Sequence, residues 1–347
     1  MKWITLFSFL FSSTLLATNH ERLMSLKTVT RFVFGSCNDQ TKAQPLWKEM
    51  LKVRPDFFMW SGDNVYADRE PGKDLKIALD KQNAIPDYLN FKKQVPIMGM
   101  WDDHDYGGNN TNGYFKDKVR NQKLFLDFLE EPMGSQRRKQ EGVYTSYTFG
   151  KIKFILLDNR YFMDLDPKAP MLGETQWQWL ESQLKNSQAS VHFIMSGLSI
   201  LSPLHPLSDG AWPNYPTERD RLLELVERLN TKGVVFLTGD MHFSTIFRRH
   251  GHLEFLSSGM THRVPRIFWG YLGRRYETSF FGIAYGLVDI AWDQETPVLS
   301  MAIRNRFGQE FHRRNFRLEA NRWVLQNELD FNLMTENSGG NFIDGVN

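Results

Sequence analysis

Short apolar runs that alternate with helix-like stretches limit most strongly how this chain can fold. Six such runs are Phe32–Phe34, Phe57–Trp60, Val95–Met98, Ile152–Leu157, Val191–Met195 and Val234–Leu237. The stretch Gly173–Lys185 is helix-like, because Trp177, Leu180 and Leu184 fall on one helical face. Alternation of this kind is typical of layered α/β folds.

The sequence after Phe281 has a different character. Three segments alternate apolar and polar residues as half-buried strands do: Ala284–Trp292, Val298–Ile303 and Phe311–Leu318. We therefore expect these segments to form a second sheet that closes the same domain.

Polar clusters follow five of the apolar runs or lie just beyond them. They are Gly-Ser-Cys-Asn after Phe34, Ser-Gly-Asp-Asn-Val-Tyr after Trp60, Trp-Asp-Asp-His-Asp after Met100, Asp-Asn-Arg after Leu157 and Thr-Gly-Asp-Met-His after Leu237. In open α/β sheets, the loops at the carboxyl ends of strands build the binding site. The presence of acidic residues, His, Cys and Arg at so many predicted strand ends indicates one functional site, at the edge of the sheets where these strand ends meet.

The residue types in these clusters suit a pair of metal ions. Two cations held close together need a bridging carboxylate and further O, N or S ligands from different loops. Glycines precede Asp63 and Asp240, where they allow a sharp turn close to an ion. Asp240 and His242 are two residues apart, so both side chains can reach the same site.

The ordered motifs resemble the PhoD-like (alkaline phosphatase D) branch of the calcineurin-like metallophosphatases. They are Gly35-Ser36-Cys37, Gly62-Asp63-x-x-Tyr66, Trp101-Asp102-Asp103-His104-Asp105, Leu157-Asp158-x-Arg160 and Gly239-Asp240-x-His242, within a resemblance that spans roughly residues 31 to 245. The resemblance implies an α/β fold, a four-layer sandwich of two mixed β-sheets flanked by helices, with the site at one edge.

The resemblance also implies a role for each motif residue. Asp63 is expected to bridge two metals, with Cys37, Tyr66 and His242 completing an Fe(III) site. Asp103 and Asp240 are expected to hold a second cation, calcium or another divalent ion. His104 is expected beside the scissile bond, and Arg160 is expected to grip phosphate oxygens.

Structural roles for some of these residues stay open. Cys37 and Tyr66 could be buried packing residues, and His104 could be a structural hydrogen-bonding group. Asp102, Asp105 and Asp158 are expected to support the ligands from behind. The wider superfamily has a further metal-binding His where this chain has Ser196-Gly197-Leu198-Ser199, and His205 is the nearby alternative.

Hydrolysis of phosphate mono- or diesters by a metal-bound hydroxide is the function that the resemblance implies. The substrate would be a small phosphorylated molecule or a phosphodiester polymer. Two alternatives are a non-catalytic binding module on the same scaffold and a phospholipase D-like phosphodiesterase acting on lipid headgroups. Specificity is expected in loops, and the segment Arg263–Thr278, rich in aromatic residues and Arg, is a candidate lid.

The N-terminus reads as an export signal. Lys2 precedes the apolar stretch Ile4–Ala17, which is shorter than the roughly 20 residues of a spanning helix. We expect a Sec-type signal peptide over residues 1–20, a phosphatase-like domain over 28–334 and a flexible tail over 335–347. The protein is then periplasmic or extracellular, and it meets a membrane only through an uncleaved signal.

The net charge of +2 gives no reason to expect specific nucleic-acid binding. Cys37 is the single cysteine, so the chain forms no internal disulfide. The sequence leaves the oligomeric state open.

Overall fold

A computed structural model describes residues 17–166, 168–203, 211–274, 276, 278–293 and 295–326. Most of the expected signal peptide, the expected tail 335–347 and His205 lie outside these residues. Within them, no helix is both long and apolar enough to cross a bilayer.

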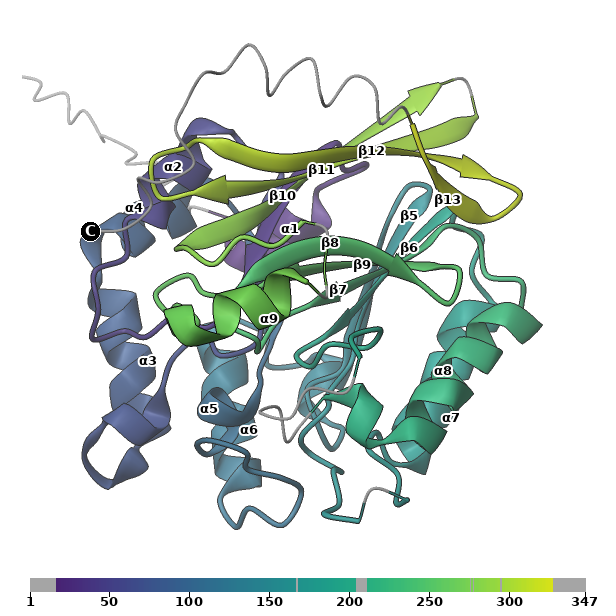
Figure 1. Cartoon of the computed structure of the whole chain (residues 1–347). Helices are drawn as coiled ribbons and strands as arrows, with labels where there is room; N and C mark the ends of the chain where they lie inside the picture. The colour runs from purple at the N-terminus through teal and green to yellow at the C-terminus, as the bar shows by residue number, and fades with distance from the viewer. Residues whose placement is uncertain are drawn as a thin grey trace, which may run out of the picture.

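Two β-sheets form the centre of the molecule (Figure 1). The first has the order β13-β12-β11-β10-β1-β2-β3, and the second has the order β4-β5-β6-β7-β9-β8. In the first sheet the strands are β1 Arg31–Gly35, β2 Phe57–Ser61, β3 Ile97–Met100, β10 Ala284–Asp293, β11 Thr296–Asn305, β12 Glu310–Glu319 and β13 Arg322–Leu325. In the second they are β4 Thr145–Phe149, β5 Ile152–Leu156, β6 Val191–Ser196, β7 Val234–Thr238, β8 Ser244–Arg249 and β9 His252–Ser257.

Helices cover the outer faces of both sheets. Figure 1 shows α7 and α8 on one side of the molecule and α2, α3 and α4 on the other. The α-helices are α1 Asn19–Met24, α2 Leu46–Lys52, α3 Leu75–Ala84, α4 Pro86–Gln94, α5 Asp103–Tyr106, α6 Lys118–Phe128, α7 Glu174–Lys185, α8 Pro216–Arg228 and α9 Trp269–Gly273. Pro86 and Pro216 begin α4 and α8, where a missing N–H costs no hydrogen bond.

The main core lies between the two sheets. Phe32 and Phe57 of the first sheet stack at 5.2 Å between ring centroids, and Phe32 meets Phe154 and Phe193 of the second sheet edge-on at 5.3 and 5.1 Å. Separate apolar clusters fill the space under the helices on each side. On α7, Trp177, Leu180 and Leu184 are buried, which confirms their expected helical face. The fold is therefore the four-layer sandwich of two mixed sheets that the family resemblance implies.

The C-terminal strands depart from the prediction. They do not form a sheet of their own, because β10 pairs antiparallel with β1 and so extends the sheet of β1–β3. The second sheet comes from β4–β9 in the middle of the chain instead. Pairing with β10 covers the edge of β1, whose other edge is taken by β2.

Helix α1 precedes residue 28, where the sequence places the start of the domain, yet it packs on the same body. The Asn19 amide donates to Ile97 O at 2.7 Å and to Leu129 O at 3.1 Å, and its Oδ1 accepts from Ile97 N at 2.7 Å. Leu23 is buried in the core between the sheets. Residues 19–24 are thus part of the folded unit.

Candidate metal centre

The site forms where strands of both sheets end. Strands β1, β2 and β3 run parallel in the first sheet, and β5, β6 and β7 run parallel in the second. Their carboxyl ends therefore meet at one edge of the sandwich. The segments that follow them bring Cys37, Asp63, Asp103, Arg160 and Asp240 close together. The first four are buried, and Asp240 is partly buried.

Four of the predicted metal ligands have left-handed backbone conformations. The φ angles are 59° at Cys37, 47° at Asp63, 68° at Asp240 and 59° at His242. Residues other than glycine rarely adopt positive φ, at a cost of roughly 1–3 kcal/mol each, and such residues gather at functional sites. The surrounding structure holds these four residues in the positions from which their side chains converge.

Two glycines let the loops approach one another closely. Gly62 has φ +95°, and a Cβ there would lie 2.6 Å from Asp102 Cβ. A Cβ on Gly239 would lie 2.6 Å from both Ser36 Oγ and Ser61 O. Both positions therefore leave no room for a side chain, and the approach of these turns to a metal ion stays a prediction.

One donor group joins Cys37, Asp63 and His242, whose ligand atoms lie within 4.8 Å of one another. The Cys37 thiol lies 3.4 Å from Asp63 Oδ2. The Tyr66 hydroxyl donates to the same Asp63 oxygen at 3.3 Å and lies 3.2 Å from His242 Nε2. All four side chains of the predicted Fe(III) site therefore surround one point.

Two further donor groups are linked to the first through shared aspartates. Asp63, Asp103 and His104 form one, and Asp102, Asp103 and Asp240 form the other. Asp63 and Asp103 each belong to two groups, so either carboxylate lies where it could bridge two cations. The sequence places Asp102 behind the ligands, but Asp102 belongs to the last group. Its Oδ2 is buried without a hydrogen-bond partner among the described residues.

The pKa values of the donor side chains are shifted in the directions that bound cations would reverse. Burial, together with the charges of neighbouring acids, raises the pKa of Asp63 well above its usual range and that of Asp240 to about 7. Burial raises the pKa of Cys37 to about 11 and lowers that of His242 to about 3. Bound cations would offset the free-energy cost of burying the charged forms, because cations stabilise carboxylate, thiolate and neutral imidazole. The donor set fits a pair of metal ions.

Comparison with known proteins identifies the family. A model of the PhoD-like phosphatases matches residues 32–264, about two thirds of the chain. The chain belongs to the PhoD-like phosphatase family. Alkaline phosphatase D of Bacillus subtilis (strain 168) is 23% identical, over 65% of this chain and 48% of that protein. The chain thus spans about half the length of this curated relative.

Solved structures share the fold. A structure of PhoD superposes with a TM-score of 0.67 at 17% identity, covering 88% of this chain and 72% of that one. A purple acid phosphatase from yellow lupin (Lupinus luteus) seeds gives 0.58 at 13% identity, covering 83% and 53%. GAP50, the anchor in the inner membrane complex of Plasmodium, gives 0.52 at 12% identity, covering 87% and 91%. These likenesses show that the chain has the same fold as PhoD and the lupin purple acid phosphatase.

Arg160 lies behind the carboxylates of this PhoD-like site. Its side chain is 2% exposed, with Nε donating to Asp102 Oδ1 at 2.5 Å and Nη2 3.8 Å from Asp103 Oδ1. Asp158 fixes the loop by accepting from the backbone N–H of Arg160 at 2.9 Å. This geometry neutralises part of the acidic charge. Contact between Arg160 and phosphate stays a prediction.

His104 is oriented by a residue that the sequence analysis did not single out. Its Nδ1 lies 2.8 Å from Asp68 Oδ1. Burial works to lower the pKa of His104, but the hydrogen bond with Asp68 and the charge of Asp103 outweigh it and raise the pKa. With Nδ1 engaged by Asp68, Nε2 is the nitrogen available to a substrate. The available signal for Asp68 is that it lies two residues after Tyr66, the last residue of the Gly62–Tyr66 motif.

The expected supporting role of Asp105 agrees with its contacts. Asp105 accepts from the backbone N–H groups of Asn64, Val65 and Asp102 at 2.9–3.1 Å, which ties the loops after β2 and β3 together. In the segment where the resemblance implies an extra His, Gly197 lies so close to Asp102 that a Cβ would be 2.7 Å from its Cγ. A side chain there would need Asp102 to move.

The segment proposed as a lid packs beside the site. Val264, Leu272 and Tyr276 form a buried cluster with Phe243, the residue after His242. Helix α9 lies within this segment, and Trp269 stacks on Phe281 at 5.4 Å. Its movement as a lid remains a prediction.

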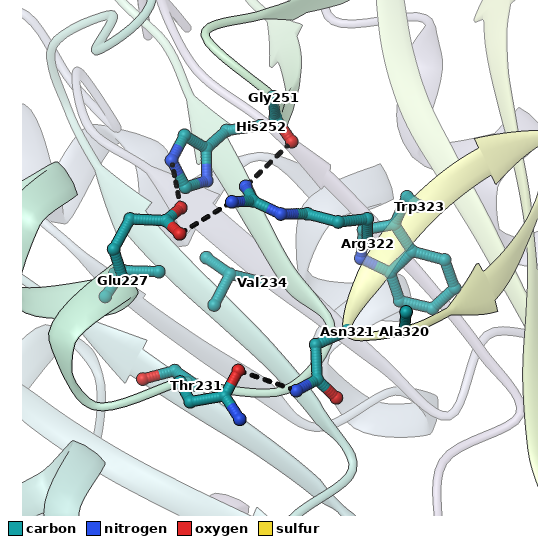
Figure 2. Close-up of a pocket in the computed structure, with 11 residues that line it drawn as sticks. Glu227, Thr231, Val234, Gly251, His252, Ala320, Asn321, Arg322 and Trp323 are labelled. Carbon is teal, nitrogen blue, oxygen red and sulfur yellow. Dashed lines mark hydrogen bonds and ion pairs between the residues drawn. The ribbon is translucent and has the colours of Figure 1, made fainter.

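A separate cavity of about 230 Å³ lies at the opposite end of β7, between α8, β9 and β13. Figure 2 shows Glu227 reaching toward both His252 and Arg322, at 3.1 and 2.6 Å. Arg322 also donates to Gly251 O at 3.2 Å. These pairings join α8 to two strands, so we assign the cluster a structural role.

Proposed function

We propose that this protein is a metal-dependent phosphoesterase that hydrolyses phosphate mono- or diesters. The observation that carries the proposal is the convergence of buried and partly buried Cys, Tyr, His and Asp donors from separate strand ends, in three linked groups, with positive charge from Arg160 behind them. Burial raises the pKa values of Asp63 and Asp240, so without added cations these carboxyl groups keep protons that bound metal ions would replace. Family membership supports the same reaction class.

The donors divide by chemical type. Thiolate, phenolate and imidazole from Cys37, Tyr66 and His242 suit iron, whereas carboxylates from Asp103 and Asp240 suit calcium or another oxygen-preferring divalent ion. Asp63 lies between the two sets and would bridge them. When bound, the two cations would neutralise phosphoryl charge and lower the pKa of a bound water.

The remaining residues would act on the substrate. His104, held by Asp68, would present Nε2 to the leaving oxygen and donate a proton to it. Arg160 would offset the negative charge of the carboxylates and keep them from repelling a phosphate. No covalent phosphoenzyme is needed in this scheme.

Metal analysis with matched assays tests this function. We would determine the metals in purified protein and measure hydrolysis of chromogenic phosphomonoesters and phosphodiesters with and without chelator. About two metals per chain, iron among them, with chelator-sensitive activity are expected. A metal-free, inert protein that cannot be reconstituted with iron plus calcium would reject the proposal.

A non-catalytic role on the same scaffold is the second candidate. The fold is shared with GAP50, which is described as an anchor. Three donor groups converge here, so we favour catalysis. The assay just described separates the two, since a binding module would show no turnover. A phosphodiesterase acting on lipid headgroups is the third candidate, and hydrolysis of phospholipid vesicles would reveal it.

We also propose export through the N-terminal apolar stretch. Because Asn19 and Leu23 pack into the folded unit, cleavage that leaves the fold intact would occur before Asn19. N-terminal mass analysis of the protein recovered from a cell envelope or medium tests this. An exported protein that begins at or after residue 20 would contradict it.

A further inference from the structure

We propose that His262 is a positioning residue of the metal centre, one imidazole that holds three of the four predicted ligands of the first cation. The inference rests on the proposed function. His262 belongs to none of the motifs that led to the site, and among the described residues it is in none of the three donor groups. It therefore acts through the ligands.

Two of the contacts are ring stacks. The His262 ring lies 4.5 Å from the Tyr66 ring at 30°, and 4.7 Å from the His242 ring at 17°. On Tyr66, the His104 ring is also close, at 4.0 Å and 32°. The His104 and His262 rings both pack against the Tyr66 ring and together restrict how the phenol can turn.

The third contact is polar. His262 Nδ1 lies 3.1 Å from the carbonyl oxygen of Cys37, to which an Nδ1–H would donate. The same carbonyl accepts from the backbone N–H of Thr261 at 3.1 Å. Cys37 has the left-handed backbone noted above, so these two bonds hold its peptide where the thiol points at Asp63.

The loop that carries His262 is itself firmly attached. The N–H groups of Gly259 and Met260 donate to Ser36 O at 3.2 and 3.0 Å. The Thr261 hydroxyl accepts from Asp39 N at 2.7 Å. The loop after β9 is thus joined to the loop after β1, and His262 extends that attachment to the loops after β2 and β7.

This arrangement has a chemical consequence. Cys37, Tyr66 and His242 come from three different loops, so their relative positions depend on contacts between loops. Partners behind metal ligands typically change metal affinity by about 10- to 100-fold when removed. His262 is expected to act in this range on the cation held by the three ligands, which we propose is Fe(III).

Two substitutions separate the ring from the hydrogen bond. His262→Phe keeps an aromatic ring and loses the donor to Cys37 O, whereas His262→Asn keeps a donor and loses the ring. His252→Phe is the matched control, because His252 is also buried and packs on Phe236 at 5.7 Å, but at the other end of β9. Each protein would be loaded with Fe(III) alone, without substrate.

The readouts are iron affinity by chelator competition, the visible absorption band of tyrosinate bound to Fe(III), and Tm of the metal-free protein. We expect His262→Asn to lose about 10- to 100-fold in affinity and to shift the band, with a smaller loss for His262→Phe. The control is expected to keep both values. The inference would be overturned if both His262 variants kept the wild-type iron affinity and absorption band. It would also be overturned if the His262 variants lost no more iron affinity than His252→Phe does for the same fall in Tm. Wild-type protein that binds no metal would overturn the proposed function itself.

Discussion

Single residues at this site combine backbone strain with buried charge. Cys37, Asp63, Asp240 and His242 all have positive φ, and three of them carry acidic side chains with raised pKa values. Neither property stabilises the metal-free fold. Both are understandable if the residues are placed for binding cations, which repay the cost of strain and burial.

Asp63→Asn is the most direct test at this scale. The change keeps the size of the side chain and removes the charge shared by two donor groups. We expect metal content to fall and kcat/KM to drop at least about a thousandfold, or about 4 kcal/mol of transition-state stabilisation. Asp80→Asn is the control, an exposed aspartate paired with Lys76 on α3. Unchanged turnover in Asp63→Asn would sink the metal mechanism.

Asp68→Asn tests the orientation and protonation of His104. We expect kcat/KM to fall about 10- to 100-fold while metal content is unchanged. In the wild type, Asp68 helps to raise the pKa of His104, so the protonated ring persists to higher pH than usual. Without the Asp68 charge that pKa falls, and the alkaline limb of the pH–rate profile should move to lower pH. A profile with an unmoved alkaline limb would show that His104 is not the proton donor.

At the scale of elements, contacts distant in sequence hold the strand ends together. Asp105 bridges the loops after β2 and β3, and residues 259–261 bond to Ser36 and Cys37 after β1. Buried Glu254 on β9 accepts from Thr238 at 2.6 Å and from Ser199 at 2.7 Å. The site is therefore supported by hydrogen bonds between elements as much as by the sheets.

Helix α1 gives a prediction at this scale. Asn19→Ala removes three hydrogen bonds that join α1 to the start of β3 and the end of α6. Because the Ile97 and Leu129 backbone groups lose a buried partner, we expect unfolding free energy to fall by about 2–3 kcal/mol. Thr18→Ala is the control, since it removes an exposed cap of the same helix, worth about 1 kcal/mol. Denaturant unfolding measures both, and equal losses would show that Asn19 does not anchor the helix.

The metal centre gathers five aspartates, Asp63, Asp102, Asp103, Asp105 and Asp240, in a chain that is nearly neutral as a whole, at +2. Removing metal should therefore destabilise the entire fold. We expect Tm to fall on the order of 5 °C in chelator at pH 8, and less at pH 5.

The fall in Tm is expected to be larger at pH 8 than at pH 5 because the carboxyl pKa values are raised. In the metal-free fold, Asp240 has a pKa of about 7, above the usual 3.8, so the folded state holds a proton that the unfolded state has released. That stabilising proton is kept at pH 5 and lost as the pH rises through 7. Thermal melts with and without chelator at the two pH values measure the effect. A larger chelator effect at pH 5 than at pH 8 would contradict it.

The local pattern of the sequence predicts the layered α/β class, the helical face of α7 and the order of the motifs, because periodicity and motif spacing are local properties. It also grouped the predicted ligands, since strand ends in an α/β sheet meet at one edge. Strands β8 and β9 were not predicted, because Arg248, Arg249 and His250 interrupt the apolar pattern.

Tertiary structure alone decided the pairing of β10 with β1, the position of Asp102 among the donors and the stacking of His262 on Tyr66. His262 lies almost 200 residues from Tyr66 along the chain, and β10 lies about 250 residues from β1. Contacts at such separations depend on how complete elements pack, and no local pattern of residue types records them.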